Sequence, residues 1–255
     1  MLKRILAHDR AKGLDLDDPR LASVRRDIIR EKKFLNKLYM EWYGLLASAI
    51  PDGDGGVLEL GSGGGFFKEF FPPAVTSDVM AVKGNCLALD GRALPFKTGS
   101  LKAIVATNTL HHIPDIALFF EEAGRCLRPG GAIAVIEPWM SPWPEFVYRK
   151  LHHEPLDKVG GWEFPSKGPL SSANGALPWI IFERDSEIFK RRFPEFSIIR
   201  KTQLMPVSYL LSGGVSLKSL APGSIYKLVR WMEETFLTRL GMRGMFIFAV
   251  SQKRG

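Results

Sequence analysis

A cluster of glycines follows a short apolar segment in the first quarter of the chain. The sequence there reads VLELGSGGGF, and Glu59, Gly61, Gly63 and Gly65 fall at alternate positions. Glycines directly after a buried strand let the backbone turn tightly and approach a ligand with no Cβ in the way. Such a loop is typical of proteins that bind a dinucleotide or another nucleoside cofactor, so it indicates a group of ligands and not yet one ligand.

Two aspartates follow this loop at the ends of further apolar segments. Asp78 closes AVTSD, 17 residues after Gly61, and Asp90 stands in LDGRALPF. A carboxylate accepts hydrogen bonds from hydroxyl and amino groups, so either aspartate could bind a ligand. Aspartate also caps helices and closes turns, so either residue alone could be structural. Their order after the glycine loop makes both of them candidates for one ligand-binding site.

Four of the five histidines stand in two adjacent pairs, His111 with His112 and His152 with His153. An imidazole titrates near neutral pH, so a histidine could take the proton of a hydroxyl nucleophile. The first pair could supply this base, or it could form a turn whose rings bond backbone groups. The second pair could act as a base or hydrogen-bond donor over a substrate. Adjacent side chains point in different directions, so we expect no metal site at either pair.

Other polar and aromatic residues follow an expected fifth strand. Glu137 closes that strand, and Tyr148 and Arg149 stand a short way beyond it. We assign these residues to the acceptor side of a site, where an arginine could bind a phosphate or carboxylate. The neighbouring tryptophans could form an apolar wall over the reacting group or a small satellite core. They are Trp139, Trp143, Trp162 and Trp179.

The elements that must position these residues alternate between strand and helix. Apolar strand patterns at VLELG, AVTSD, NCLALDG, LKAIVATN and AIAVIEP are separated by short loops or by the helical IALFFEEAGRCL. Unbroken apolar strands in this order predict a parallel sheet covered by helices on both faces. Ligands of such sheets bind at the carboxyl ends of the strands. A helix and strand, then another helix and a terminal strand, follow after residue 184.

Two further segments flank or interrupt this pattern. Residues 19–50 have apolar positions at helical spacing, which predicts an amphipathic helix or helix pair before the first strand. Residues 138–182 hold seven of the 17 prolines and four of the six tryptophans, with little periodicity, and we expect them to form a cap. The expected organisation is an N-terminal helical extension over 1–50 and one ligand-binding domain over 51–255.

Composition limits the class of protein further. The chain has 255 residues and a net charge of +8, which favours an anionic partner without choosing one. The sequence has no apolar run long enough to span a membrane and no signal peptide pattern, so we expect a cytoplasmic protein. Cys86 and Cys126 lie in apolar surroundings, and we expect both to be reduced core thiols. The basic face of the first helical segment could be a solvated surface or a peripheral membrane contact; it comprises Arg25, Arg26, Arg30, Lys32, Lys33 and Lys37.

Over residues 55–138 the chain resembles the class I S-adenosylmethionine-dependent methyltransferases, in particular the small-molecule group that includes ubiquinone-biosynthesis enzymes. Four motifs carry the resemblance: the glycine loop, Asp78 at the end of the second strand, LDGRALPF, and LKAIVATNTLHHIPD followed by LRPGG. The resemblance implies a Rossmann-like α/β fold with a mostly parallel seven-stranded sheet, helices on both faces and an antiparallel C-terminal strand. It also implies S-adenosylmethionine as the cofactor.

The resemblance further implies a role for each motif residue. Gly61, Ser62 and Gly63 would pack against the methionine part of the cofactor, and Glu59 would help to hold its amino group. Asp78 would bond the ribose hydroxyls. Asp90 and Gly91 would meet the adenine, and Asn108 would lie beside the cofactor at the end of the fourth strand.

The chain departs from the family pattern at two places. Only 12 residues separate Asp78 from Asp90, so we expect a short loop where the family has a helix, and Lys102 stands where an acidic residue is usual. An NAD-binding protein is a weaker alternative, because Phe66 replaces the third glycine of the dinucleotide fingerprint.

The predicted function is therefore methyl transfer to a small-molecule or lipid-linked acceptor, with O-methylation as the first choice. A C-methyltransferase acting on a quinone-like ring is the second. A non-catalytic scaffold that binds the cofactor is a third alternative. No recognisable RNA-binding module occurs and the basic residues are dispersed, so we expect neither a nucleic-acid partner nor an obligate protein partner.

Overall fold

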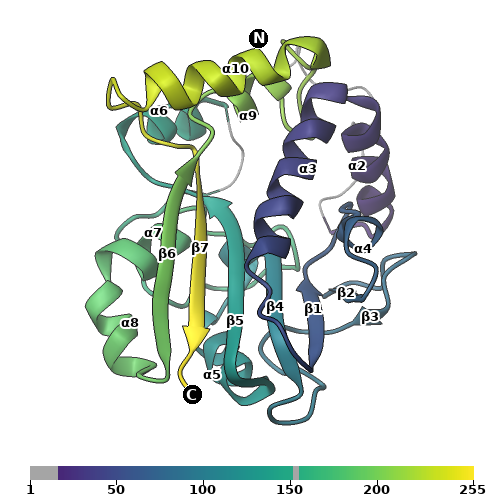
Figure 1. Ribbon diagram of the computed structural model, residues 1–255, viewed down its shortest axis with the longest axis vertical. Coiled ribbons are helices and arrows are strands. Elements are labelled where there is room, and N and C mark those ends of the chain that lie inside the picture. Colours follow the sequence, from purple (N-terminus) through teal and green to yellow (C-terminus); the bar gives the residue numbers. More distant parts are fainter. Residues whose placement is uncertain (1–16, 152–154) are drawn as a thin grey trace.

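The computed structural model describes residues 17–151 and 155–255, and its centre is one sheet of seven strands (Figure 1). The strands are β1 (Gly56–Leu60), β2 (Ala74–Asp78), β3 (Leu87–Ala88), β4 (Leu101–Thr107), β5 (Leu127–Pro138), β6 (Phe196–Leu204) and β7 (Phe246–Lys253). Their order across the sheet is β3-β2-β1-β4-β5-β7-β6. Only β7 runs antiparallel to its neighbours β5 and β6, while β1 to β5 pair in parallel. The predicted fold class is confirmed.

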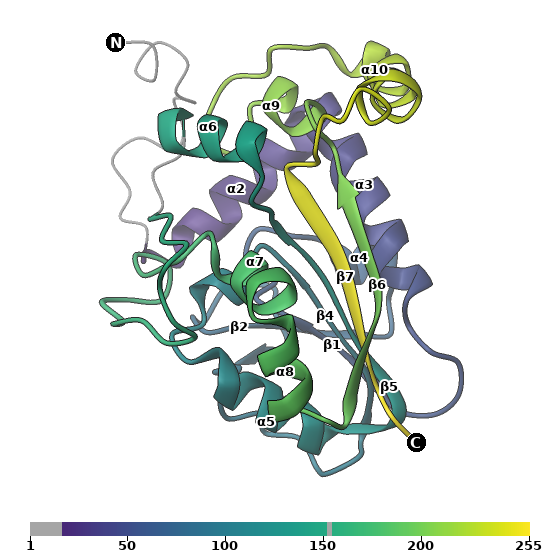
Figure 2. The same cartoon turned by 90° about the vertical axis from the view of Figure 1, so that its left-hand side faces the viewer.

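Helices cover both faces of this sheet because the central strands are apolar on both sides. Successive residues of β1 enter different cores: Val57 packs in one cluster with Trp42, and Leu58 packs in the other with Phe119. The first face is covered by α3 (Lys33–Ser48), and the second by α5 (Ile116–Cys126) and α8 (Ser186–Arg192) (Figure 2). Unbroken apolar strands are therefore explained by burial on both faces.

The helix pair predicted over residues 19–50 is present as α2 (Arg20–Glu31) and α3. Helix α2 lies directly against the glycine loop: a Cβ built on Gly64 would come within 2.6 Å of the Ala22 carbonyl oxygen. Helix α3 packs its apolar face on the sheet, with Leu38 and Trp42 fully buried. Helix α2, which precedes β1 in the chain, therefore covers the glycine loop.

The connection between β2 and β3 is a short loop, as predicted from the spacing of the two aspartates. Met80 and Val82 of this loop pack against Ala22 of α2. Helix α2 thus covers apolar side chains that the shortened connection would otherwise leave open to water.

The expectation that both cysteines are core thiols is wrong for Cys86. Cys126 is buried in α5, but Cys86 is exposed just before β3. The Lys68 ammonium donates to the Cys86 sulfur at 3.0 Å, and this bond lowers the pKa of the thiol to about 7. The apolar neighbours of Cys86 in sequence did not reveal that β3 is a two-residue edge strand with exposed side chains.

The segment 138–182 and the chain after β6 build the end of the molecule above the strand ends. The segment 138–182 contains α6 (Pro142–Leu151) and α7 (Leu177–Trp179), and it ends within a π-helical turn over Ile180–Arg184. After β6 come α9 (Ser208–Ser212), α10 (Tyr226–Met232) and a second π-helical turn over Glu233–Leu237. The remaining short helices are α4 (Phe67–Phe70) and single turns at Leu110–His112 and Gly223–Ile225. None of the described helices is long and apolar enough to cross a lipid bilayer.

Candidate functional site

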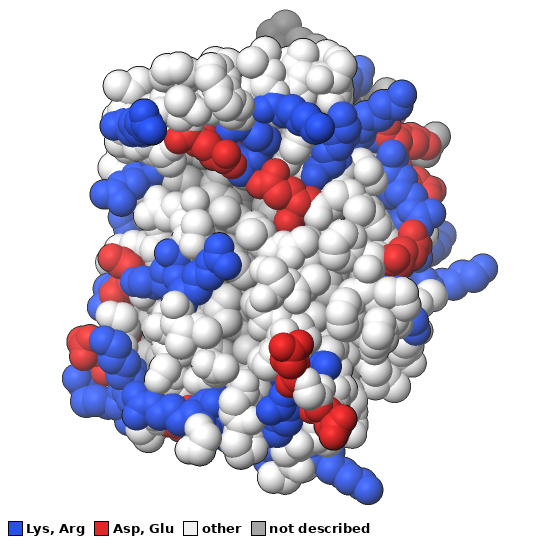
Figure 3. All heavy atoms as spheres, in the orientation of Figure 1, with Lys and Arg blue, Asp and Glu red and all other residues white. Residues whose placement is uncertain are grey.

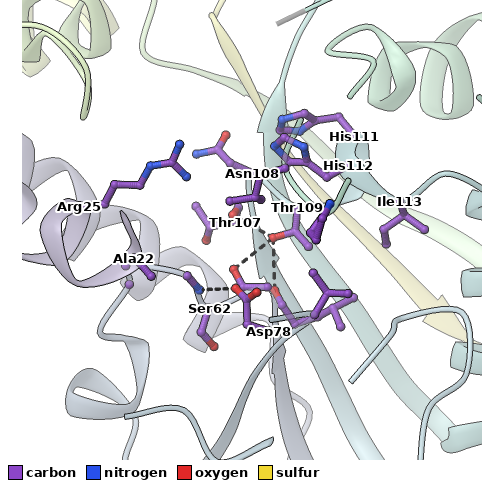
Figure 4. Close-up of a pocket in the computed structure, with 18 of the residues that line it drawn as sticks. Ala22, Arg25, Ser62, Asp78, Thr107, Asn108, Thr109, His111, His112 and Ile113 are labelled. Carbon is purple, nitrogen blue, oxygen red and sulfur yellow. Dashed lines mark hydrogen bonds between the residues drawn. The ribbon is translucent and has the colours of Figure 1, made fainter. Parts of the chain in front are cut away.

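A cavity of about 420 Å³ opens at the carboxyl ends of β1, β2 and β4. Its floor is the glycine loop, residues 78–80 and 89–92 form one side, and residues 107–109 and 111–114 form the other. Helices α2 and α3 and parts of the segment 138–182 close it from above. Figure 4 shows side chains from these separate elements converging on one space. This is the position where open parallel sheets bind their ligands.

The glycine loop needs glycine for two different reasons. Gly61 and Gly63 have φ angles of +65° and +47°, a left-handed conformation that side chains disfavour. A Cβ on Gly61 would also lie 2.4 Å from the Thr109 side chain, on the loop after β4. The close approach of these two loops forms the cavity floor.

Glu59 and Ser62 form a buried pair under this loop. The Ser62 hydroxyl donates to the Glu59 carboxylate at 2.6 Å and accepts from the Ser77 amide at 3.2 Å. Burial raises the pKa of Glu59 to about 7, although the Ser62 bond opposes the rise. Glu59 lines the cavity, so a cationic group bound there would find a carboxylate with few other charge partners.

The two aspartates both line the cavity but have different surroundings. Asp78 accepts from the Gly63 and Met80 amides, each at 3.0 Å, and burial raises its pKa. Asp90 is paired with Arg92 at 2.6 Å, and this arginine lowers its pKa. Both carboxylates therefore lie at the cavity wall, with Asp78 next to the glycine loop and Asp90 beside Arg92.

Asn108 follows β4 in a conformation that is rare for residues other than glycine. Its φ is +52°, and its amide donates to the Ile136 carbonyl oxygen at 2.9 Å. Asparagine tolerates this region better than most residues. Its side chain is directed toward the cavity in Figure 4. The strained turn also brings Thr109 against Gly61.

His111 and Glu137 form a buried pair beside the cavity. His111 Nδ1 lies 2.6 Å from Glu137 Oε2, and the two side chains are 2% and 0% exposed. The other oxygen of Glu137 accepts from the Thr109 and Leu110 amides at 2.7 and 2.8 Å. Glu137 was predicted to lie on the acceptor side. In the structure it lies behind His111 and does not line the cavity. The carboxylate fixes both the turn and the imidazole.

The remaining predicted residues divide into two groups. His112, Gly91 and Tyr148 line the cavity; His112 Nδ1 lies 3.1 Å from the Ser172 carbonyl oxygen, and the Tyr148 hydroxyl donates to the Met245 carbonyl oxygen at 2.6 Å. Arg149 does not line it, because its side chain is exposed and paired with Glu145 at 3.0 Å. His152 and His153 lie outside the described residues.

The tryptophan wall is not present in the structure. None of Trp139, Trp143, Trp162 and Trp179 lines the cavity; all four pack in the cores on the two sheet faces. The indole of Trp162 donates to Asp185 at 2.9 Å and stacks on Phe193. The tryptophans do not form a separate satellite core either, because they extend the two main cores of the protein.

Sequence reasoning missed Arg25 and a group of aromatic residues in the cavity. Arg25 was interpreted as part of a basic surface, yet its guanidinium is directed into the cavity from α2 (Figure 4). Aromatic side chains come from α3, α6, α9 and β7 and line the upper end: Tyr39, Tyr43, Tyr148, Tyr209 and Phe246. No local motif marks them, because they occupy ordinary helix and strand positions.

The other basic residues of the N-terminal helices are partly solvated, as Arg30, Lys33 and Lys37 are exposed. Arg30 pairs with Glu69, and Lys32 and Lys37 donate to carbonyl oxygens of residues 214, 217 and 223. The lysines thereby connect α2 and α3 to the chain after β6. The membrane contact considered for this face stays a prediction.

Comparisons with known proteins agree with this geometry. A family model described as a methyltransferase domain matches residues 58–135. The demethylmenaquinone methyltransferase of Roseiflexus castenholzii is 28% identical over 190 residues, which cover 66% of this chain and 75% of that protein.

Two solved structures have the same fold. One is a Haloferax volcanii methyltransferase in complex with the Trm112 methyltransferase activator, at a TM-score of 0.56 and 13% identity, covering 94% of this chain and 98% of that one. The other is geranyl diphosphate C-methyltransferase from Streptomyces coelicolor with S-adenosyl-L-homocysteine, at a TM-score of 0.50 and 14% identity. That match covers 98% of this chain and 92% of the other.

The strand order, the glycine loop after β1 and the carboxylate at the end of β2 define a Rossmann-like protein that binds a nucleoside cofactor. Residues 58–135 match a methyltransferase-domain model and 190 residues are similar to a demethylmenaquinone methyltransferase, which supports methyl transfer with S-adenosylmethionine as the cofactor. The same findings set aside the NAD-binding alternative.

Proposed function

We propose that this methyltransferase transfers the methyl group to a hydroxyl of a small, largely apolar acceptor. The observation that carries the proposal is the buried His111–Glu137 pair at the cavity wall. A hydroxyl must lose its proton during methylation, and an imidazole fixed by a carboxylate is suited to accept it.

The residues of the cavity fit the cofactor. The glycine loop forms the cavity floor and would hold the methionine part, and Glu59, which also lines the cavity, would meet its ammonium group. Asp78 would bond the ribose hydroxyls, and Asp90 with Gly91 would meet the adenine. Arg25 would bind the methionine carboxylate through a charge-assisted bond.

Bound S-adenosylmethionine supplies an electrophilic methyl group on a sulfonium, so the protein must align a nucleophile and exclude water. In this proposal Glu137 holds the proton on His111 Nδ1, which leaves Nε2 as the nitrogen that accepts the hydroxyl proton. Glu137 also stabilises the imidazolium that results. Its bonds to the Thr109 and Leu110 amides keep this arrangement rigid.

The upper end of the cavity determines the acceptor. It is lined by aromatic and aliphatic side chains, with phenol hydroxyls of Tyr148 and Tyr209 as polar groups. Such a lining suits a flat ring or a lipid-linked group better than a charged metabolite. We also propose that residues 138–182 act as the cap of a methyltransferase domain over 51–255, because Pro155, Leu156 and Leu170 reach the cavity.

A C-methyltransferase acting on a quinone-like ring is the second candidate. The observation that favours it is the similarity to a protein named demethylmenaquinone methyltransferase, together with the apolar upper cavity. A ring carbon activated by its own hydroxyl needs less help from a base. The His111–Glu137 pair would then matter less for the rate.

The test is a methyl-transfer screen with radiolabelled S-adenosylmethionine against phenols, quinols and lipid-linked hydroxyl compounds. For an O-methylated product we expect Glu137→Gln to lower kcat by about a hundredfold or more, because glutamine favours the wrong imidazole tautomer. Arg149→Ala is the matched control at an exposed residue away from the cavity. A C-methylated product, or an O-methylation rate unchanged in Glu137→Gln, would refute the proposal.

A further inference from the structure

The segment that follows Leu217 places its apolar side chains outward and its polar side chains inward. Seven large apolar residues of this segment are between 39% and 82% exposed; they are Leu220, Ile225, Leu228, Trp231, Met232, Phe236 and Leu240. Ile225, Leu228, Met232, Phe236 and Leu240 follow one another at intervals of three or four residues, so they form a stripe along one side of a helical segment. We call these seven residues the outer stripe.

The opposite side of the same segment is polar and buried. The Tyr226 hydroxyl donates to Glu41 of α3 at 2.6 Å, and Arg230 pairs with both Glu41 and Glu233 at 2.6 Å. Glu233 is 1% exposed and accepts from the Val207 and Ser208 amides at the start of α9. A network of partly buried ion pairs therefore determines which side of α10 faces the protein, and it leaves the apolar side in water.

This arrangement is the reverse of an ordinary surface helix, whose apolar side faces the core. Contiguous apolar surface of this kind marks a contact with a protein or a membrane. Figure 1 shows α10 lying across one end of the molecule, and Figure 3 shows a largely uncharged surface at that end with basic and some acidic side chains bordering it.

The charges next to the outer stripe indicate its partner. Residues 217–243 contain five basic and two acidic residues. Both acidic residues, Glu233 and Glu234, are paired with Arg230, whereas Lys218, Lys227, Arg239 and Arg243 are exposed. A helix with an apolar side and flanking Lys and Arg is suited to the interface of an anionic lipid bilayer. Trp231, an aromatic residue with a polar NH group, is typical of that interface.

We propose that α10 and the turn after it dock this protein on an anionic lipid surface through the outer stripe. Helix α9 lies directly beneath α10, bonded to Glu233, and Tyr209 of α9 lines the upper cavity. Docking would therefore hold the acceptor end of the cavity next to the lipid. The placement of the acceptor rests on the proposed function, because it takes the acceptor to be a molecule carried in the membrane. The docking itself is independent of the proposed function.

The docking is tested by co-sedimentation of the full chain with vesicles of phosphatidylcholine alone or mixed with phosphatidylglycerol. We expect binding to the mixed vesicles that weakens as salt is added. The variant Leu228→Gln, Phe236→Gln should lose about tenfold in partition for each side chain, and Lys227→Gln about fivefold. The matched control is Val159→Gln, Ile199→Gln, whose side chains are 91% and 57% exposed elsewhere on the surface.

Quenching of tryptophan fluorescence by brominated lipids gives a second readout. We expect quenching in the wild-type protein and its loss in Trp231→Phe, since the other five tryptophans lie outside this segment. The proposal is overturned if wild-type protein ignores mixed vesicles or if the Leu228→Gln, Phe236→Gln variant binds as well as the control. It is also overturned if sedimentation shows a dimer that the same variant dissociates, because a second copy would then cover the stripe.

Calorimetric titration with S-adenosylmethionine separates this proposal from the proposed function. The outer-stripe variants should bind the cofactor as the wild type does, because none of the substituted residues lines the cavity. Vesicle binding without any hydroxyl acceptor would leave the docking intact and remove the proposed acceptor class.

Discussion

The replacement Gly61→Ala tests whether the glycine loop must lie against the loop after β4. Alanine at this position would keep a φ of +65°, which costs about 1–2 kcal/mol for a residue with a Cβ. The new methyl group would lie 2.4 Å from both Thr109 Oγ1 and Cγ2, and overpacking of this kind costs about 1–3 kcal/mol. We therefore expect the free energy of unfolding to fall by about 2–5 kcal/mol.

Two controls separate the backbone cost from the steric cost. Gly99 has a similar φ of +68°, but a Cβ there would meet nothing within 4 Å, so Gly99→Ala should cost only about 1–2 kcal/mol. Thr109→Ala removes both clashing atoms. Added to Gly61→Ala, it should recover about 1–3 kcal/mol in a double-mutant cycle.

The assay is urea denaturation of the four variants, with calorimetric titration of S-adenosylmethionine beside it. We expect Gly61→Ala to weaken cofactor binding at least about tenfold, and Gly99→Ala to leave it unchanged. Equal stability losses in Gly61→Ala and Gly99→Ala, or no coupling between residues 61 and 109, would show that the two loops do not pack as described.

Three further predictions follow from the cavity and its surroundings. Asp78→Asn should weaken S-adenosylmethionine about tenfold or more by calorimetry, because a charge-assisted acceptor is lost; unchanged affinity would contradict its position at the ribose. Burial raises the pKa of Glu59 from 4.5 to about 7 in the folded, cofactor-free protein. The protonated carboxyl therefore contributes about 3 kcal/mol to the free energy of unfolding below about pH 4.5, and this contribution is lost as the pH rises through about 7. In denaturation curves, Glu59→Gln should lack this pH dependence of the free energy of unfolding. Cys86, with its pKa lowered to about 7 beside an ammonium group, should react with iodoacetamide at neutral pH while buried Cys126 does not, as peptide mass mapping would show.

The fold and the residues around the cavity floor could be predicted because their signals are local. Gly61 and Asn108 directly follow a strand and Asp78 ends one, and parallel strands bring their carboxyl ends to one edge of the sheet. Once the strands were recognised, the topology alone placed these residues around one cavity. The short connection between Asp78 and Asp90 was likewise predicted from the number of residues between them.

The acceptor side could not be predicted in the same way. Trp162 stands among residues that could form a wall, but its indole turns to Asp185 and Phe193, which flank the distant helix α8. Glu137 closes a strand as predicted, yet its carboxylate points to His111 rather than to a substrate. The direction of a side chain depends on which distant element packs against it, and composition does not contain that information.

The sequence by itself indicated the sheet, the order of strands and helices along the chain and the glycine loop, and its resemblance to a known family implied the cofactor. Only the tertiary structure decided that Arg25 enters the cavity, that Glu137 supports His111 and that α10 presents its apolar side to the outside. Periodicity shows that a helix has an apolar side and a polar side. It does not show which of them faces the protein, because that choice depends on partners such as Glu41, which lies 189 residues before Arg230 in the chain.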